Sequence, residues 1–198
     1  MQILNYKGFQ MKKNTTIVIL CLSGLLSTSI NAFDNKREGF MVSAGLGLSS
    51  IHTDFKQEYG GWSGIGRDAE GGLATSFKIG YGFSEQFSLY FMRNSTILEY
   101  KNDPNNNTYE NCILGIGANY YLKPEGLTYL MGGIGLGRFT DYEDTDVENI
   151  GHGFMLGIGY EISPHINVEV SYMGTRIDDN EADVNTDTLH VTLNYYWY

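Results

Sequence analysis

Cysteine and proline are scarce in this chain, and the shortage of cysteine excludes two kinds of site. The 198 residues contain two cysteines, Cys21 and Cys112, and three prolines. We expect Cys21 to be lost with an N-terminal export signal, which leaves Cys112 alone. A single cysteine can form no intrachain disulfide and no zinc site built from cysteine pairs.

Basic residues are also few. The chain has 13 lysines and arginines against 23 aspartates and glutamates, which gives a net charge of −10. Three of the lysines precede Ala32 and every acidic residue follows it, so the part after Ala32 keeps ten basic residues and a net charge of −13. Such a negative surface makes nucleic acid an unfavourable partner.

The N-terminal apolar stretch, Thr16–Leu26, is too short for a membrane-spanning helix. Met11-Lys12-Lys13 places positive charge before it, and Ala32 supplies a small residue after it. This pattern predicts a secretory signal peptide that is cleaved before Phe33.

We therefore assign residues 1–32 to a signal peptide, with Met11 as an alternative start, and residues 33–198 to one domain. Lipidation at Cys21 would require a small residue just before it, and Leu20 is not small.

Glycine and aromatic residues are abundant, with 25 Gly, 15 Tyr and 10 Phe. In Gly151–Tyr172, apolar side chains fall on every second residue, and Ser163-Pro164-His165 interrupts them once. Successive side chains of a strand point to opposite faces, so this stretch predicts a hairpin with one apolar face and one small or charged face. Because the second face is rich in glycine, it suits a crowded interior.

The same alternation predicts eight strands along the chain. They are expected at Gly39–Ile51, Gly71–Phe83, Phe87–Leu98, Asn111–Leu122, Leu127–Arg138, in the two halves of Gly151–Tyr172, and around Leu189–Trp197. Three connections are short, namely Ser84–Gln86, Lys123–Gly126 and Ser163–His165. Four are long and hydrophilic, namely His52–Glu70, Glu99–Glu110, Thr140–Ile150 and Asp178–Asp187.

An even number of antiparallel strands, joined by alternating short and long connections, is typical of outer-membrane barrels. Strands of about ten residues can cross a bilayer at a tilt. Closure of the last strand on the first would leave no backbone edge in lipid. We predict an all-β, eight-stranded antiparallel up-and-down transmembrane β-barrel, with short periplasmic turns and long extracellular loops.

Aromatic residues gather at the short-turn ends of the predicted strands. They are Phe83, Phe87, Tyr120, Tyr121, Tyr129, Tyr160, Tyr195, Tyr196, Trp197 and Tyr198. We interpret them as an aromatic girdle at the periplasmic interface.

The chain from Phe33 to Tyr198 resembles the OmpA/OmpX-type family of eight-stranded outer-membrane barrels. The resemblance rests on this architecture and on the ending LHVTLNYYWY, which is similar to the signal read by the barrel-assembly machinery. That signal usually ends on an outward aromatic residue. Here the outward register ends on Trp197 and Tyr198 is one extra, so either a bulge restores the phase or the signal is atypical.

This resemblance implies a bacterial outer-membrane location, contact with outer-membrane lipid and lipopolysaccharide, assembly through the C-terminal strand and a monomeric barrel. It implies no single activity, because small barrels of this type differ in what they do.

Several charged residues fall on the predicted inner face. Lys78, Glu161, Glu169 and His190 point inward by phase, and we expect a bulge near Met92 to turn Arg93 inward as well. An interior this narrow is filled by side chains. The group could be a structural salt-bridge lattice or a gated proton or ion path, and we favour the lattice.

The inward GxG repeats, such as Gly133/Gly135/Gly137 and Gly157/Gly159, do not open helices as phosphate-binding loops do. We expect them to make room for large neighbouring side chains.

Two predicted loops are rich in acidic residues. They contain Asp141, Glu143, Asp144, Asp146 and Glu148, and Asp178, Asp179, Glu181, Asp183 and Asp187. Such oxygen ligands could hold Ca²⁺ or Mg²⁺ that bridges to lipopolysaccharide phosphates, but the spacing is not that of an EF-hand. We favour solvated loops and assign no metal, cofactor or catalytic residue.

An enzyme would need a nucleophile and a base together near the outer rim. His52, His152 and His190 are candidates for the base, but no matching serine signature accompanies them, and His165 reads as a turn residue. We expect a non-enzymatic protein with a structural or surface-interaction role. It would present extracellular loops for adhesion or for contact with lipopolysaccharide, phage or host. The alternatives are a small channel for ions or hydrophobic molecules and a lipid-A-modifying enzyme.

Overall fold

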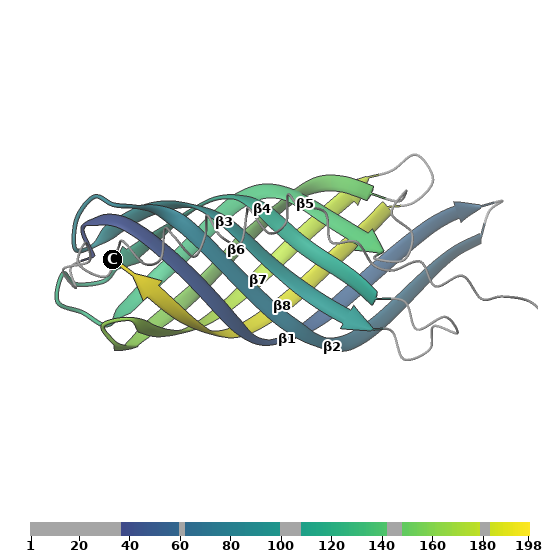
Figure 1. The fold of residues 1–198 in the computed structure, drawn as a ribbon. Coiled ribbons are helices and arrows are strands. Elements are labelled where there is room, and N and C mark those ends of the chain that lie inside the picture. The colour runs from purple at the N-terminus through teal and green to yellow at the C-terminus, as the bar shows by residue number, and fades with distance from the viewer. Residues whose placement is uncertain (1–36, 60–61, 100–107, 142–147, 179–182) are drawn as a thin grey trace, which may run out of the picture. The chain divides into compact units, whose positions relative to one another are not determined.

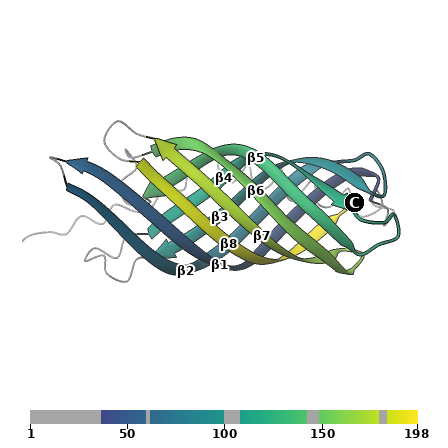
Figure 2. The same ribbon diagram turned by 180° about the vertical axis from the view of Figure 1, so that it is seen from behind.

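The computed structural model describes residues 37–59, 62–99, 108–141, 148–178 and 183–198. The strands are β1 (Gly39–Tyr59), β2 (Trp62–Gly82), β3 (Phe87–Glu99), β4 (Thr108–Tyr121), β5 (Thr128–Asp141), β6 (Glu148–Ser163), β7 (Ile166–Asp178) and β8 (Asp183–Trp197). Each strand pairs antiparallel with the next, and β8 closes on β1 to complete a barrel (Figures 1 and 2). The predicted fold class is confirmed. Within the described residues, no helix is long and apolar enough to span a membrane.

The pairing register fixes the stagger of the barrel. The row of paired residues that starts at Phe77 on β2 passes through Arg93, Leu114, Leu136, His152, Arg176, Asn185 and Asp54 and returns to β2 at Arg67. The row therefore returns to β2 ten residues away from where it started, and this offset is the shear of the barrel. Such a shear requires the strands to tilt, as Figure 1 shows.

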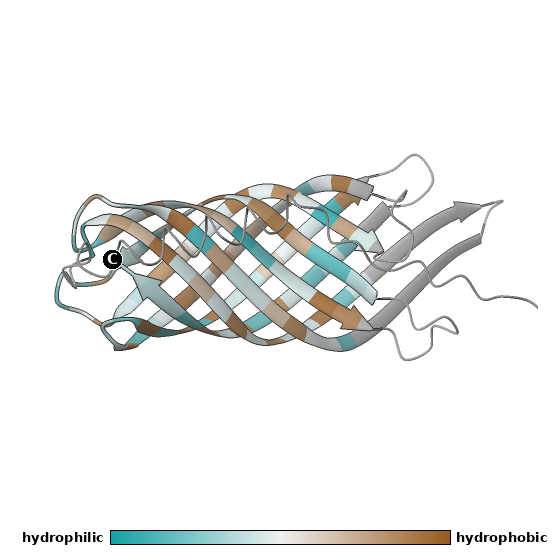
Figure 3. Ribbon diagram, in the orientation of Figure 1, coloured by the Kyte–Doolittle hydropathy of each residue, from teal (hydrophilic) through white to brown (hydrophobic). Residues whose placement is uncertain are grey.

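The outer face of the barrel is apolar and exposed. Leu46 on β1, Phe91 on β3 and Ile134 on β5 are 64%, 68% and 64% exposed, and each of the remaining strands also carries exposed apolar residues in its outward phase. Figure 3 shows hydrophobic segments alternating with polar ones along the strands. An apolar surface of this extent is rare on soluble monomers, but it is the lipid-facing surface of a transmembrane barrel.

The inner face is crowded, and its glycines provide the room. A Cβ at Gly159 would lie 2.1 Å from the ring of Tyr129, and one at Gly133 would lie 2.4 Å from the terminal methyl group of Met92. These glycines therefore allow large side chains from neighbouring strands to fill the lumen, as the GxG repeats predict.

The strands are longer at their extracellular ends than the sequence predicts. Residues 52–70, expected to form a loop, are mostly the paired ends of β1 and β2, which continue to Tyr59 and Trp62. The prediction was wrong because it followed hydrophobic alternation, which marks a strand only where one face is buried or meets lipid. β2 pairs with β3 only from Leu73 onward, so the β1–β2 hairpin extends beyond the other strands (Figure 1).

The other three predicted loops are also shortened by strand residues at their ends. Their centres, at 100–107, 142–147 and 179–182, lie outside the described residues. Most of the acidic residues considered as cation ligands are among these or in strand ends whose side chains are not described.

Arg93 points outward, so the prediction of a bulge near Met92 was wrong. β3 pairs without interruption with both β2 and β4 across this position. Met92 and Asn94 face the lumen and are buried, whereas the Arg93 side chain is 46% exposed. Strict alternation therefore continues through a charged residue, because a long arginine side chain can carry its charge away from the apolar surface.

The predicted aromatic girdle divides between the two faces. Phe83, Phe87, Tyr120, Tyr160 and Tyr195 lie on the outer face as expected, with exposures of 37–61%. Tyr121, Tyr129, Tyr196 and Tyr198 instead face the lumen and are at most 6% exposed. The bunching of aromatics near the turns thus reflects both an interfacial band and an aromatic interior at this end.

The end of the chain keeps its phase. β8 shows no register shift against β1 or β7, so Trp197 is the last residue in the outward phase and Tyr198 turns inward. Tyr198 stacks on Tyr196, with ring centroids 5.6 Å apart. The bulge considered from the sequence is absent from this strand, and the outward aromatic is the penultimate residue. The one shift between β6 and β7 lies at Glu161/Ser163.

Candidate functional site: a polar cluster inside the barrel

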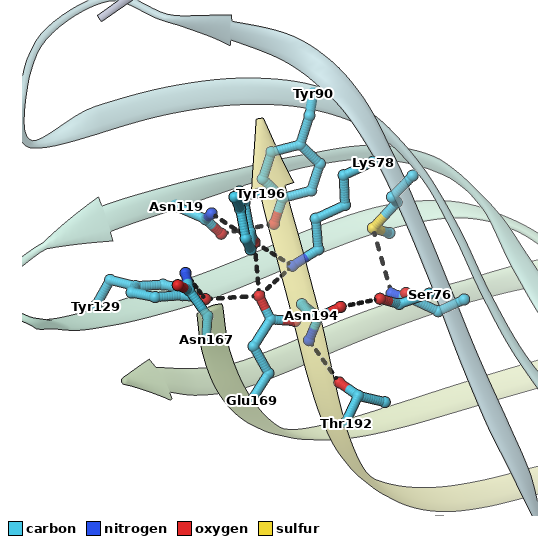
Figure 4. Close-up of polar contacts among 12 residues, drawn as sticks. Ser76, Lys78, Tyr90, Asn119, Tyr129, Asn167, Glu169, Thr192, Asn194 and Tyr196 are labelled. Atoms are coloured by element: carbon cyan, nitrogen blue, oxygen red, sulfur yellow. Dashed lines mark hydrogen bonds and ion pairs between the residues drawn. The ribbon is translucent and has the colours of Figure 1, made fainter. Parts of the chain in front are cut away.

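A buried ion pair lies at the centre of the most extensive polar group in the described lumen. Nζ of Lys78, on β2, lies 2.5 Å from Oε1 of Glu169, on β7, and the two side chains are 0% and 2% exposed (Figure 4). The pair reaches across the barrel, because β2 and β7 are separated by β1 and β8. Both positions lie on the inner phase of their strands, as predicted.

Tyrosine hydroxyls complete the surroundings of Glu169. Tyr129 and Tyr196 each donate a hydrogen bond of 2.6 Å to the same oxygen, Oε1, and Lys78 also donates to the Tyr196 hydroxyl at 2.8 Å (Figure 4). Asn167 donates to the Tyr129 hydroxyl at 3.1 Å. One carboxylate oxygen therefore accepts from three donors that come from three different strands.

Two further residues close the cluster. The Tyr90 hydroxyl donates to Oδ1 of Asn119 at 2.9 Å, and Asn119 donates to the Tyr196 hydroxyl at 3.4 Å. Nζ of Lys78 lies 5.3 Å from the centre of the Tyr90 ring and 5.4 Å from that of Tyr196, within the range of cation–π attraction. We call these seven residues, Lys78, Tyr90, Asn119, Tyr129, Asn167, Glu169 and Tyr196, the polar cluster.

The polar cluster is stable only as a complete unit. Taking two charges out of water costs several kcal/mol for each ion, and the attraction between them repays this only when further hydrogen bonds satisfy both groups. Here the carboxylate has tyrosine donors and the ammonium has both a carboxylate and a hydroxyl acceptor. Such an arrangement holds strands together across the lumen.

Smaller polar groups and methionines fill the lumen beyond the polar cluster. Ser76 donates to Asn194, and Asn94 contacts the sulfur of Met155 at 2.7 Å. Nε2 of His190 lies 2.7 Å from the hydroxyl of Thr96. All of these residues are at most 7% exposed, so the interior is filled at several successive levels.

A second ion pair closes the barrel at its short-turn end. The guanidinium of Arg37, just before β1, donates to Glu161 on β6 at 2.8 and 3.1 Å. It also donates to the carbonyls of Pro124 and Gly126 in the β4–β5 turn, at 2.8 and 2.9 Å. Its carbon lies 3.8 Å from the centre of the Tyr121 ring. Arg37 therefore connects the start of β1 with β4, β6 and the turn between β4 and β5.

The charge of Arg37 is held by these partners. Burial disfavours the charged guanidinium, but the hydrogen bond to Glu161 and the nearby acidic groups together raise the pKa of Arg37 above its ordinary value. The Arg37 guanidinium therefore stays protonated at physiological pH.

Of the charged residues predicted to point inward, Lys78, Glu161, Glu169 and His190 do so and Arg93 does not, and the four do not form one network. Lys78 and Glu169 pair with each other, Glu161 pairs with Arg37, and His190 contacts Thr96. Sequence reasoning missed Arg37, because it precedes the first alternating residue. It also missed Tyr129 and Tyr196, because they were assigned to the aromatic girdle, and it singled out no role for Tyr90.

The other residues considered as candidates remain apart. His52 and His152 lie on the outer face, and His190 is buried in the lumen. His165 lies in the β6–β7 turn as predicted and contacts the carbonyl of Tyr196 at 2.9 Å. Among the described residues, no group of three His, Cys, Asp or Glu side chains could hold a metal ion.

An exposed apolar outer face, a filled polar lumen and eight closed strands define a transmembrane barrel of the outer-membrane class. The profile of the outer membrane protein beta-barrel domain family matches residues 18–196, and the chain belongs to this family. Family and fold together imply the bacterial outer membrane.

Solved structures agree with this fold. Ail, the attachment invasion locus protein of Yersinia pestis, superposes with a TM-score of 0.55 at 14% identity and covers 81% of this chain and 99% of its own. Neisserial surface protein A gives 0.51 at 16% identity, with coverages of 80% and 97%. OprG from Pseudomonas aeruginosa gives 0.50 at 12% identity, with coverages of 82% and 98%. These identities support the shared fold alone. No curated protein sequence matches the chain significantly.

Proposed function

We propose that this protein is a closed outer-membrane anchor that presents an extracellular surface for contact with other surfaces. The observation that carries the proposal is the filled lumen. The polar cluster, the Arg37–Glu161 pair and the buried methionines occupy successive levels of the interior, and their side chains are almost fully buried. This packing argues against the alternative of a small channel, because a conducting path needs water or mobile side chains along its length.

The β1–β2 hairpin is the most prominent described element of that surface. Its pairing continues to Tyr59 and Trp62, well past the last pair of β2 with β3 (Figure 2). A rigid scaffold that carries projecting segments is a common way to build a binding surface. Ail has been solved with a heparin analogue, sucrose octasulfate. The acidic loops of the present chain favour a partner of opposite charge, such as a basic patch on another surface.

A non-enzymatic role fits the same arrangement. An acyl-transfer or hydrolytic site needs a base and a nucleophile within hydrogen-bond reach. Two of the candidate histidines, His52 and His152, are exposed on the outer face of different strands, and His190 is buried inside the lumen.

Export and assembly follow from the sequence. We propose that residues 1–32 direct export and are cleaved before Phe33, and that the C-terminal strand engages the barrel-assembly machinery through Trp197 as a penultimate outward aromatic. A barrel whose eight strands close on themselves needs no second copy, so we propose a monomer.

Conductance in planar bilayers tests the closed lumen. Purified, folded protein should give no stepwise current above the leak of the bilayer. A K78M/E169L variant removes the buried charges but keeps the volume, and it should also stay silent. Steady single-channel steps from the wild-type protein would contradict the proposal.

Surface contact is tested separately. Bacteria that display the wild-type protein should adhere to a cultured epithelial layer more than bacteria that display a variant in which residues 54–67 are replaced by a two-residue Asn-Gly turn. Heat-modifiable migration on gels checks that the shortened barrel still folds. Equal adhesion of the two strains at equal surface levels would contradict the role given to the hairpin.

A further inference from the structure

A shallow apolar groove crosses the outer face over β4, β5 and β6. Two ridges border it. The upper ridge, nearer the extracellular ends of the strands, is formed by Leu114, Leu136 and His152, and the lower ridge, nearer the short turns, by Ile116, Ile134 and Phe154. Each ridge is one row of paired residues, as the strand register requires. Between the ridges runs a row of glycines whose missing side chains face the lumen, so the floor of the groove is peptide backbone.

Basic residues stand around this groove. Its upper ridge continues to Arg93 on β3, which pairs with Leu114, and to Arg176 on β7, which pairs with His152. Arg138 lies two residues beyond Leu136 toward the extracellular end of β5, in the same outward phase.

Arg93 occupies a costly position. Its neighbours across the sheet, Phe77 and Leu114, are apolar and 45% and 48% exposed, so Arg93 lies within the lipid-facing band. An arginine facing lipid near the middle of a bilayer costs about 2–4 kcal/mol. Its ion pair with Glu110 offsets part of this cost, and the part of the side chain that remains exposed is free to meet a ligand.

The direction of the Arg93 side chain indicates where that ligand lies. Its guanidinium donates to Oε1 of Glu110 at 2.6 Å and to the hydroxyl of Ser95 at 3.4 Å. Both residues are farther toward the extracellular ends of β3 and β4. The charge is thus carried along the outer face toward the outer leaflet, where it remains partly exposed.

We propose that the outer face of β3–β7 binds one phosphorylated glycolipid of the outer leaflet, lipopolysaccharide, at a defined site. Arg93 and Arg138 bind a phosphate of its lipid A part. His152 and Arg176 lie at the other end of the upper ridge. One acyl chain lies in the groove between the two ridges. Planar guanidinium groups match phosphate oxygens well, and the apolar ridges match an acyl chain. This inference rests on the outer-membrane location and is independent of what the extracellular hairpin contacts.

Native mass spectrometry of the folded protein in detergent micelles can measure this site. The probes are bisphosphorylated hexa-acyl lipid A, the same lipid A without phosphates, and phosphatidylglycerol. The wild-type protein should retain one lipid A in preference to the other two. R93Q/R138Q should weaken lipid A binding on the order of tenfold, because two charge-assisted contacts are lost. K123Q, which removes one positive charge from the β4–β5 turn, should bind as the wild type does.

A groove variant separates the acyl chain from the phosphate. I134A should weaken lipid A binding on the order of threefold, through lost apolar contact, while its preference for the phosphorylated form stays unchanged. Equal binding of lipid A by R93Q/R138Q and wild type, or equal retention of all three lipids, would overturn the proposal. So would a dimer that R93Q/R138Q dissociates, since the occupant would then be a second copy. Should the double variant fail to fold, R138Q alone keeps the Arg93–Glu110 pair and gives the same test. Loss of adhesion would not affect any of these results.

Discussion

In this barrel the inner faces of the strands are largely polar and the outer faces are largely apolar, whereas a soluble protein buries apolar side chains and exposes polar ones. On β8, Thr192, Asn194 and Tyr196 face the lumen and are at most 4% exposed, whereas the intervening Leu193 and Tyr195 are 55% and 42% exposed. Buried polar atoms on the inner face are held by partners such as the Lys78–Glu169 pair. On the described outer face, apolar side chains predominate and contacts such as Arg93–Glu110 are few, because acyl chains need no polar partners.

This difference shows which interactions can carry specificity. Apolar contact with lipid is non-directional, so the outer face fixes which residues face out but not how the strands pair. Directional contacts across the lumen fix the arrangement of the strands. Substitutions on the two faces should therefore destabilise the barrel for different physical reasons, and the variants below test this.

The largest effect is expected when the polar cluster loses one charge. Lys78→Met leaves Glu169 buried without its cation and should reduce the free energy of unfolding by about 3–5 kcal/mol. The K78M/E169L double variant should recover most of this loss, because it leaves no unpaired charge. Urea unfolding in micelles, followed by the loss of the fast-migrating folded band, measures both.

The matched control for Lys78→Met is Lys123→Met in the exposed β4–β5 turn, which should unfold as the wild type does. If the single and double variants of the polar cluster were equally unstable, the cluster would not act as a unit.

A charge introduced on the outer face should lower the free energy of unfolding slightly less than Lys78→Met does. Leu193 is central in the outward run of β8, and Leu193→Arg should destabilise the barrel by about 2–4 kcal/mol in a bilayer. Unfolding from liposomes measures the change, with Leu193→Val as a control of nearly unchanged polarity. The cost should shrink in short-chain micelles, where water reaches the outer face. An identical cost in both would mean that lipid contact is not its origin.

A pair of glycine substitutions compares the faces at equal change of volume. Gly159→Ala places a methyl group against the ring of Tyr129 and should cost about 1–3 kcal/mol by overpacking. Gly132→Ala lies on the outer face, where the nearest atom is the tip of the Leu156 side chain at 3.3 Å, and should be nearly neutral. Thermal unfolding in micelles would separate them, and equal midpoints would contradict the comparison.

The smallest effect is expected at the periplasmic end. Arg37→Ala removes hydrogen bonds to Glu161 and to the β4–β5 turn and should cost about 1–2 kcal/mol, since each such bond has a modest net worth. Conductance should stay at the baseline, because the polar cluster still fills the lumen beyond it. A new conductance in this variant would assign the closure of the barrel to Arg37 alone.

Alternation in the sequence was sufficient to predict the eight strands and their inner and outer residues, because lipid imposes a strict period of two. It was not sufficient where lipid is absent. Residues 52–59 and 62–70 pair as strands although their sequence lacks hydrophobic alternation, and backbone hydrogen bonding alone leaves no mark in the sequence. At Arg93 the alternation was correct, and the expectation that a charge must turn inward was wrong.

The candidate site was predicted in part for the same reason. The phase of Lys78 and Glu169 placed both in the lumen, but phase cannot say which residues meet across it. That depends on the stagger of the closed barrel, which brings β2 opposite β7. Tyr129 and Tyr196 join the polar cluster through this stagger, whereas Arg37, which lies outside any strand, forms the separate pair with Glu161.

Arg37 also imposes an order on assembly. Its partners come from the β4–β5 turn and from β6, which are made long after it during synthesis, so its binding place is absent until most of the sheet has formed. A barrel that has begun to close from β1 alone would leave this guanidinium in the aqueous periplasm. Docking of Arg37 therefore follows the formation of β6, and protection of its side chain from a guanidinium-modifying reagent would report that β6 and the β4–β5 turn have come together around it.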